Sequence, residues 1–105
     1  MLTTNYINKM KLLTKEIERK LPKLYETKDE SDPKAHVKFF TPDANWTWYA
    51  TEYDGEDKFF GLVQGHEDEL GYFSLSQLKK VRGLLGLPVE RDILFTATPL
   101  SDVRR

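Results

Sequence analysis

From His36 onward the sequence follows a residue pattern with a period of two, and this pattern restricts the fold more than any other feature. Successive side chains of a β-strand point to opposite faces of a sheet, so a period of two predicts strands rather than helices. We expect strands at residues 36–40, 45–53, 59–64 and 70–73. Asp54-Gly55 is a strong turn signal, and the other connections are also short. The strands should therefore form an antiparallel meander.

The second predicted strand carries two tryptophans and two tyrosines in the stretch NWTWYATEY, residues 45–53. The period of two places Trp46, Trp48 and Ala50 on one face of this strand. The opposite face then carries Thr47, Tyr49, Thr51 and Tyr53. Since the rings are divided between two faces, they do not form one continuous platform for stacking on bases. We expect the tryptophans to pack beneath a helix, and Tyr49 and Tyr53 to remain available for contact with a partner.

Two short helices are predicted, one on each side of these strands in the sequence. Thr14 is a suitable N-cap for the first helix, and Pro22 lacks the amide hydrogen that a longer helix needs. This limits the first helix to about residues 15–21. Ser74 and Gln77 have the spacing of a capping box, which predicts the start of the second helix. Gly83 is the expected left-handed stop of that helix.

The stretch DILFT, residues 92–96, is predicted to be a fifth strand or an extended segment against the sheet. The predicted fold class is therefore α+β, with a four- to five-stranded, mainly antiparallel sheet and two short helices packed on it. The 105 residues are enough for one hydrophobic core. We expect a flexible N-terminal arm at residues 1–11 and a single α+β domain at residues 12–105.

Several classes of chemistry find no support in the sequence. The chain has no cysteine, which excludes disulfides and thiolate nucleophiles and fits a reducing cytoplasm. Its apolar runs are too short for a signal peptide or a membrane span, so we expect a cytoplasmic protein without a membrane partner. It contains no glycine-rich phosphate loop and no G-x-S-x-G elbow. His66 precedes three acids but has no second histidine at metal-ligand spacing, so we expect no metal and no cofactor.

The formal net charge of −1 conceals a segregation of charge along the chain. Residues 26–72 carry twelve acidic and four basic side chains, whereas both ends of the chain are basic. The acids beside the aromatic hairpin would repel a phosphate backbone, which disfavours base stacking there. The basic residues of the helices would form one binding patch if both helices lie on the same side of the sheet; the alternative is a solvated helix face. These residues are Lys15, Arg19, Lys20 and Lys23 near the first helix and Lys79, Lys80 and Arg82 on the second.

A family resemblance is carried by four segments, which occur in the order LLTKEIERKLPKLY, VKFFTPDANWTWYATEYDGEDKFFGLVQG, ELGYFSLSQLKKVRG and LPVERDILF. Together they resemble the small bacterial family catalogued as domain of unknown function 2958, over about residues 12–100, with residues 1–11 outside the pattern. The combination of NWTWYATEYDGED with ELGYFSL makes the likeness specific. The resemblance implies cargo of plasmids and integrative conjugative elements, near antirestriction and DNA-processing genes. It implies no catalytic or binding residue.

Three functions are compatible with these observations. The first is a non-enzymatic accessory binding protein of a mobile genetic element, monomeric or homodimeric, that contacts nucleic acid or a DNA-processing protein through the basic helix faces. The second is an acidic surface that mimics DNA and inhibits a host DNA-binding or restriction enzyme. The third is an enzyme that uses Glu52 and Asp54 as an acid pair, since both are expected on one face of a strand.

Overall fold

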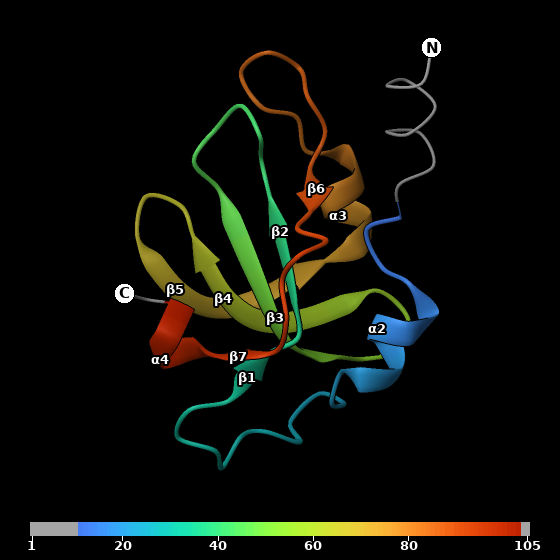
Figure 1. Cartoon of the computed structure of the whole chain (residues 1–105), viewed down its shortest axis with the longest axis vertical. Helices are drawn as coiled ribbons and strands as arrows, with labels where there is room; N and C mark the ends of the chain where they lie inside the picture. Colours follow the sequence, from blue (N-terminus) through green and yellow to red (C-terminus); the bar gives the residue numbers. More distant parts are fainter. Residues whose placement is uncertain (1–10, 104–105) are drawn as a thin grey trace.

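The computed structural model describes residues 11–103 of the chain (Figure 1). The expected flexible arm at residues 1–11 lies, apart from Lys11, outside the described residues. The strands are β1 (Lys34–Ala35), β2 (Val37–Phe40), β3 (Thr47–Tyr53), β4 (Lys58–Gln64), β5 (Asp68–Ser74), β6 (Glu90–Arg91) and β7 (Thr98–Pro99). The helices are α2 (Lys15–Lys20), α3 (Leu75–Lys80) and α4 (Leu100–Val103). The four strands predicted by the period of two are thus present, with small shifts at their ends.

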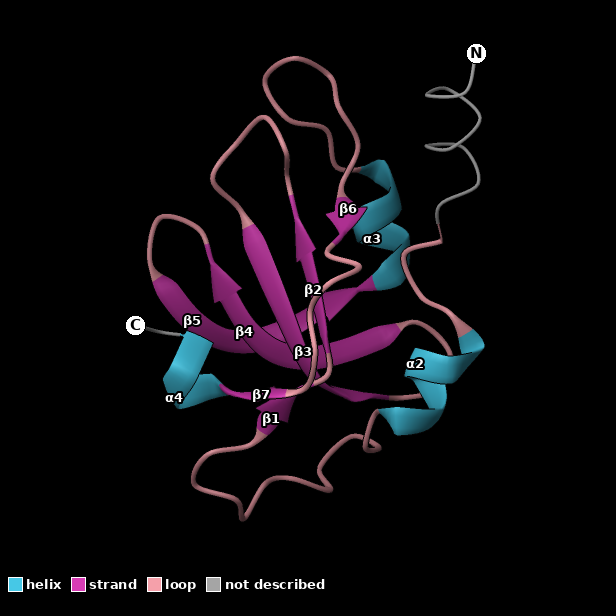
Figure 2. Ribbon diagram, viewed as in Figure 1, coloured by secondary structure: helices cyan, strands magenta, loops and turns pink. Residues whose placement is uncertain are grey.

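Five strands form one antiparallel sheet in the order β5-β4-β3-β2-β6 (Figure 2). The run from β2 to β5 is a meander, since each of these strands pairs with the next along the chain. This sheet, together with the short helices, confirms the predicted α+β fold class. A second, two-stranded sheet joins β1 to β7. The sequence does not predict this small sheet, because two-residue strands leave no periodic pattern.

The fifth strand of the sheet lies earlier in the chain than residues 92–96, where a fifth strand or an extended segment against the sheet was expected. β6 pairs with the end of β2 and stops before Asp92. The carboxylate of Asp92 accepts a hydrogen bond from the amide of Leu94 at 3.0 Å, and its carbonyl accepts one from the amide of Phe95 at 3.2 Å. These bonds make a turn at a place where the apolar residues of DILFT predict an extended strand.

A β-bulge in β3 changes which face the last residues of that strand occupy. The register against β4 shifts between Ala50 and Glu52, so Thr51 is an extra residue. Beyond this point the alternation is reversed, and Tyr53 lies in the same core cluster as Trp48. The prediction that these two side chains face opposite sides of the sheet is therefore wrong, because a strict period of two makes no allowance for an extra residue.

The larger core lies between one face of the sheet and the helices α2 and α3. Phe39 and Phe59 are fully buried in it, with ring centroids 5.6 Å apart. Ile17 of α2, the following Leu21 and Leu78 of α3 pack in the same cluster. Both helices therefore cover the same face of the sheet (Figure 2).

Both helices begin at their predicted caps. The side chain of Thr14 accepts a hydrogen bond from the amide of Ile17 at 3.2 Å at the start of α2. Ser74 and Gln77 form the predicted capping box at the start of α3. Each cap satisfies amides of the first helical turn that have no partner within the helix. Local sequence signals were therefore sufficient to place the helix starts.

The loop at residues 83–87 is held by Asp43, in the connection between β2 and β3. Oδ2 of this carboxylate accepts hydrogen bonds from the amides of Leu85 and Leu87 at 2.6 and 3.3 Å. Gly83 does not have the left-handed backbone expected of a helix stop. It is instead a close-packing position, because a Cβ built on Gly83 would lie 1.6 Å from Oδ1 of Asp43. The same loop presents Leu84 to solvent with 90% of its surface exposed.

The opposite face of the sheet is only partly covered. Ala35, Tyr49, Leu62 and Leu100 form a smaller core there, to which α4 contributes the leucine. The loop at residues 22–33 crosses the same face and is bonded to β3. Between this loop and α4 the sheet remains open to a cleft.

Candidate functional site

The predicted basic residues lie on the two helices that share one face of the sheet. The exposed residues in question are Lys15, Arg19 and Lys20 on α2 and Lys79, Lys80 and Arg82 on or just after α3. Both helices pack on the larger core, so the condition for a joint basic surface, that they lie on the same side of the sheet, is met. We call these six residues the basic helix face.

α3 supplies the stronger positive charge of the two helices. In α2 two glutamates accompany the basic residues, and Nζ of Lys20 lies 3.9 Å from Oε1 of Glu16. α3 contains no acid, and no ion pair joins its basic residues to a carboxylate within residues 11–103. The Arg82 guanidinium donates to the carbonyls of Lys79 and Val81 at 3.0 and 2.8 Å. These bonds hold its charge at the carboxyl end of the helix, where the helix dipole favours a cation.

Tyr49 and Tyr53, the other predicted contact residues, are both buried, with 7% and 5% of their surfaces exposed. The ring of Tyr49 lies 5.8 Å from the ring of Phe95 in the smaller core. Tyr53 stacks on Phe59 at 4.6 Å in the larger core, and burial raises the pKa of its phenol. The expectation that these two rings are available to a partner is therefore not supported, because both faces of β3 are covered at these positions.

Glu52 is a buried carboxylate, with 4% of its surface exposed. Its Oε1 accepts a hydrogen bond from the amide of Tyr25 at 2.8 Å. Its Oε2 accepts one from the amide of Thr27 at 2.9 Å and another from the hydroxyl of the same residue. These donors compensate for the loss of water around a buried charge. Glu52 thereby fixes the loop at residues 22–33 over the sheet.

Asp54, the other member of the predicted acid pair, is an acceptor in a turn. Its Oδ1 accepts hydrogen bonds from the amides of Glu56, Asp57 and Lys58 at 2.8, 2.8 and 3.0 Å. The bond from Glu56 is the first of the causes that lower the pKa of Asp54 below its ordinary value. Glu52 thus holds the loop at residues 22–33, and Asp54 holds a turn. A catalytic acid or base has a different task, since it needs to exchange a proton with a substrate.

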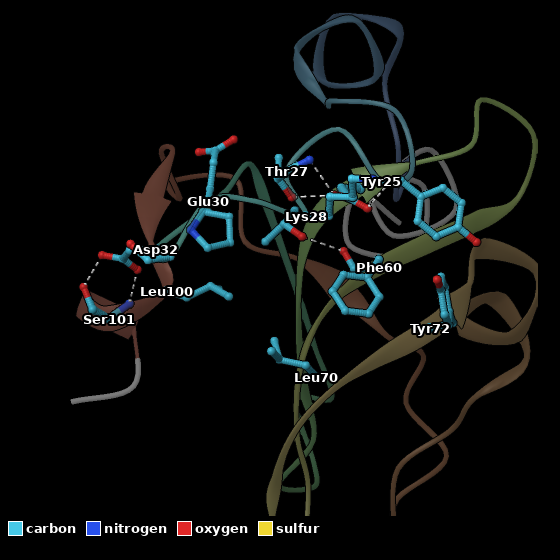
Figure 3. Close-up of a pocket in the computed structure, with 14 residues that line it drawn as sticks. Tyr25, Thr27, Lys28, Glu30, Asp32, Phe60, Leu70, Tyr72, Leu100 and Ser101 are labelled. Atoms are coloured by element: carbon cyan, nitrogen blue, oxygen red, sulfur yellow. Dashed lines mark hydrogen bonds between the residues drawn. The ribbon is translucent and has the colours of Figure 1, made fainter.

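A cleft that the sequence did not predict lies on the second face of the sheet, between the loop at residues 22–33, the strands β4 and β5, and α4 (Figure 3). Its volume is about 530 Å³, within the range of about 300–1,000 Å³ that is typical of ligand sites. Aromatic and aliphatic side chains line it, namely Tyr25, Phe60, Leu70, Tyr72 and Leu100. We call it the Tyr72 cleft.

Tyr25 forms one wall of the Tyr72 cleft in a backbone conformation that is rare for its residue type. Its φ of 73° lies in the left-handed region, which residues other than glycine seldom adopt. The bond from its amide to Glu52 holds this conformation in place. The neighbouring side chain of Tyr25 is the first cause that raises the pKa of Tyr72. A strained residue fixed by a buried carboxylate is typical of a functional site.

The sequence contains only weak signals for this cleft. Its residues come from a loop, three strands and a short helix that are distant along the chain. The loop at residues 26–34 has no large apolar residue, and this composition predicts a solvated connection. Leu70 and Tyr72 are the one local signal, since they are neighbours on one face of an edge strand. A hydrophobic face on an edge strand indicates that another segment of the chain or a binding partner covers it.

The described part of the chain contains neither a cluster of metal ligands nor a membrane-spanning helix. Residues 11–103 contain no group of three or more histidine, aspartate or glutamate side chains that could hold a metal ion. None of the helices in this range is long and apolar enough to cross a membrane.

The fold and its surfaces define a small α+β domain with a basic helix-covered face and an opposite face that carries a cleft. The chain belongs to the family described as Protein of unknown function (DUF2958), whose profile matches residues 7–103. Residues 7–11 are therefore part of the family pattern, contrary to the expectation that residues 1–11 lie outside it. Comparison with curated proteins and with solved structures found no match.

Proposed function

We propose that the protein is a non-enzymatic accessory binding protein of a mobile genetic element that contacts nucleic acid through the basic helix face. The observation that carries this proposal is the cluster of Lys79, Lys80 and Arg82, which are exposed and form no ion pair within residues 11–103. Basic side chains without acidic partners attract phosphates and release the counterions bound to them. The likeness to cargo of plasmids and conjugative elements supports DNA as the nucleic acid.

The proposal is tested by the salt dependence of DNA binding. The probe is a fluorescent duplex of about 20 base pairs, and its binding is followed by anisotropy over a range of salt concentrations. The test variant replaces all three residues of the α3 cluster: Lys79→Gln, Lys80→Gln and Arg82→Gln. We expect its affinity at low salt to fall at least about tenfold and the slope of log K against log salt to become shallower by about 2–3.

A matched control removes the same charge from other parts of the surface. Lys28, Lys34 and Lys58 are exposed and lie outside α2 and α3, so their triple replacement by glutamine gives the same net charge. We expect this control to bind the duplex within about twofold of the wild-type affinity. Equal weakening by both triple variants, or a wild-type protein that does not bind the duplex at low salt, would contradict nucleic-acid binding by this face. A DNA-processing protein would then be the partner to test against the same variants.

The second candidate function is inhibition of a host DNA-binding or restriction enzyme by an acidic surface. It is supported by exposed acids on the hairpin between β4 and β5, at residues 67–69, and in the loop at residues 26–32. Mimicry of DNA needs carboxylates that are free to replace phosphates. Several acids do not meet this condition, since they accept hydrogen bonds within the fold, namely Glu26, Asp32, Asp54, Asp57 and Asp68. Unaltered restriction of incoming DNA in cells that express the protein would count against this function.

A further inference from the structure

The Tyr72 cleft lies on the face of the sheet opposite the basic helix face, and the proposed DNA binding does not use it. It borders β5, which is the outermost strand of the sheet and pairs with β4 over seven residues without a bulge. Within residues 11–103 no segment pairs with the outer side of β5. A regular edge strand with unpaired backbone groups is a template for the addition of another strand.

Two side chains of β5 provide apolar surface on the cleft side that an added strand could cover. Leu70 and Tyr72 line the cleft and are about half exposed, at 53% and 52%. The ring of Tyr72 lies 5.1 Å from the ring of Phe60 on the neighbouring strand (Figure 3). Alternate side chains of a strand beside β5 would point to this same face and cover these apolar groups. Gly71 between them is open, since a Cβ placed there meets no atom within 4 Å.

The polar groups around the cleft are mainly acidic. Glu30, Asp32 and Glu52 line it together with one basic residue, Lys28, which gives these lining side chains a formal net charge of −2. Acids at residues 68–69 also begin the edge strand and are exposed. Such a rim favours a basic partner over an acidic one. A second copy of this chain would instead bring two acidic rims together.

The wall of the cleft is formed before any ligand binds. Glu52 is buried and bonded to the loop through three donors, and it fixes Tyr25 with its ring beside Tyr72. A partner therefore does not have to order this loop, which lowers the entropic cost of binding. A preformed apolar cleft beside an open strand edge combines two requirements for recognition of an extended peptide.

We propose that β5 and the Tyr72 cleft bind an extended peptide segment of a partner protein by strand addition. One apolar side chain of the peptide is seated among Phe60, Leu70 and Leu100. A lysine or arginine close to it in the peptide faces the acidic rim. The backbone of the peptide pairs with the outer side of β5, and the apolar and basic side chains supply the specificity.

The first test is a selection of random peptides of about 12 residues, displayed on phage, with the full-length protein as the target. We expect the enriched sequences to place an aliphatic or aromatic residue within two positions of a lysine or arginine. The most enriched sequence is then synthesised, labelled and titrated with the protein. A selection that yields no such combination overturns the proposal.

The second test locates the bound peptide with variants. We expect Leu70→Ser and Tyr72→Ala each to weaken its binding at least about tenfold, and Glu30→Lys to weaken it several-fold at low salt. The matched controls are Leu84→Ser, which removes an exposed leucine from a distant loop, and Glu56→Lys, which reverses an exposed acid in a different turn. Both controls should bind within about twofold of the wild-type affinity. Equal effects of Leu70→Ser and Leu84→Ser contradict the assignment to the cleft.

Self-association is the remaining alternative for this edge, and sedimentation of the free protein distinguishes it. A molecular mass that rises with protein concentration and returns to that of a monomer in Leu70→Ser would assign β5 to an interface between copies and overturn peptide binding. Wild-type protein that stays monomeric over the concentration range of the titrations supports the proposal. Neither outcome depends on DNA binding, because the residues of the α3 cluster are unchanged in these variants.

Discussion

Several carboxylates of this protein accept hydrogen bonds from backbone amides that are distant in the sequence. Asp32 accepts one from Ser101, Asp43 from Leu85, Glu52 from Tyr25 and Asp57 from Ser76. A carboxylate in such a bond provides a stronger acceptor than a neutral group, so a few residues suffice to fasten a loop. At the scale of single residues, part of the acidic character of residues 26–72 therefore serves the fold.

Among these carboxylates, the buried Glu52 should contribute most to the free energy of unfolding. In Glu52→Ala the amides of Tyr25 and Thr27 lose their acceptor, and we expect the free energy of unfolding to fall by about 2–4 kcal/mol. Urea denaturation measures this loss, and hydrogen exchange at the two amides should accelerate with it. Glu56→Ala is the control, because this exposed side chain should change stability by no more than about 0.5 kcal/mol. Equal losses in the two variants would refute the role of Glu52.

The lowered pKa of Asp54 makes the stability of the folded protein depend on pH in the acid range. Because the pKa is lower in the folded state than in the unfolded chain, the unfolded chain binds the proton more readily. The contribution of Asp54 is therefore present above about pH 4 and is lost as the pH falls through the native pKa. In Asp54→Asn we expect lower stability at neutral pH and a shallower decline in acid. Chemical denaturation over a series of pH values measures both, and an unchanged profile would show that the charge is unimportant.

At the scale of elements, the pairing of β3 with β4 depends on a close approach of their backbones. Gly61 of β4 pairs with Ala50, next to the bulge of β3. A Cβ at Gly61 would lie 1.8 Å from the carbonyl oxygen of Tyr49. Neither strand can move away, because β4 also pairs with β5 and both faces of the sheet carry core residues.

Replacement of Gly61 by alanine should therefore be costly, although alanine adds a single methyl group. We expect Gly61→Ala to destabilise the protein by about 3 kcal/mol or to prevent folding, because the clash is with backbone rather than with a side chain. Gly71→Ala on the adjacent strand is the matched control, since its Cβ meets open space, and we expect a change within about 0.5 kcal/mol. Thermal and urea unfolding of the pair provide the measurement, and similar stabilities would contradict the close approach.

The elements that could be predicted from the sequence are those whose signals are local. Thr14, Ser74 and Gln77 act on amides within a few residues, so the helix starts could be read directly. The alternation of residue types likewise indicated four strands of the sheet. The bulge at Thr51 could not be predicted in this way, because it is defined by the pairing with β4. The fifth strand was predicted at the wrong residues for a related reason. The turn at Asp92 prevents the apolar residues that follow it from forming a strand.

At the scale of the whole molecule, the sheet separates two surfaces of opposite chemistry. The helices α2 and α3 cover one face with exposed basic residues, and the Tyr72 cleft opens on the other face with an acidic rim. The basic residues were predicted because their charges are visible in the sequence. The cleft was not predicted, because Tyr25, Tyr72 and Leu100 meet only after the chain has folded.

Because the two surfaces lie on opposite faces, both proposed ligands should bind at the same time. We expect saturating DNA duplex to change the affinity of the selected peptide by less than about twofold, since neither ligand contacts the residues of the other. Titration of the labelled peptide with and without the duplex at one salt concentration measures this coupling. Mutual exclusion of the two ligands would show that they share a surface, and it would contradict the separation of the faces.

The bulge at Thr51 also governs how this chain can tolerate changes in length. Deletion of the extra residue would restore the strict alternation of β3 and leave Glu52 opposite Phe60 and Tyr53 opposite Phe59, as they are now. A residue added between Thr51 and Glu52, by contrast, would turn the carboxylate of Glu52 to the other face and leave the loop at residues 22–33 without its anchor. A residue added to the exposed loop at residues 26–32 would only lengthen a connection, at a small entropic cost. Insertions should therefore be accepted in that loop and rejected in the last part of β3, although hydrogen bonds join the two segments in the folded protein.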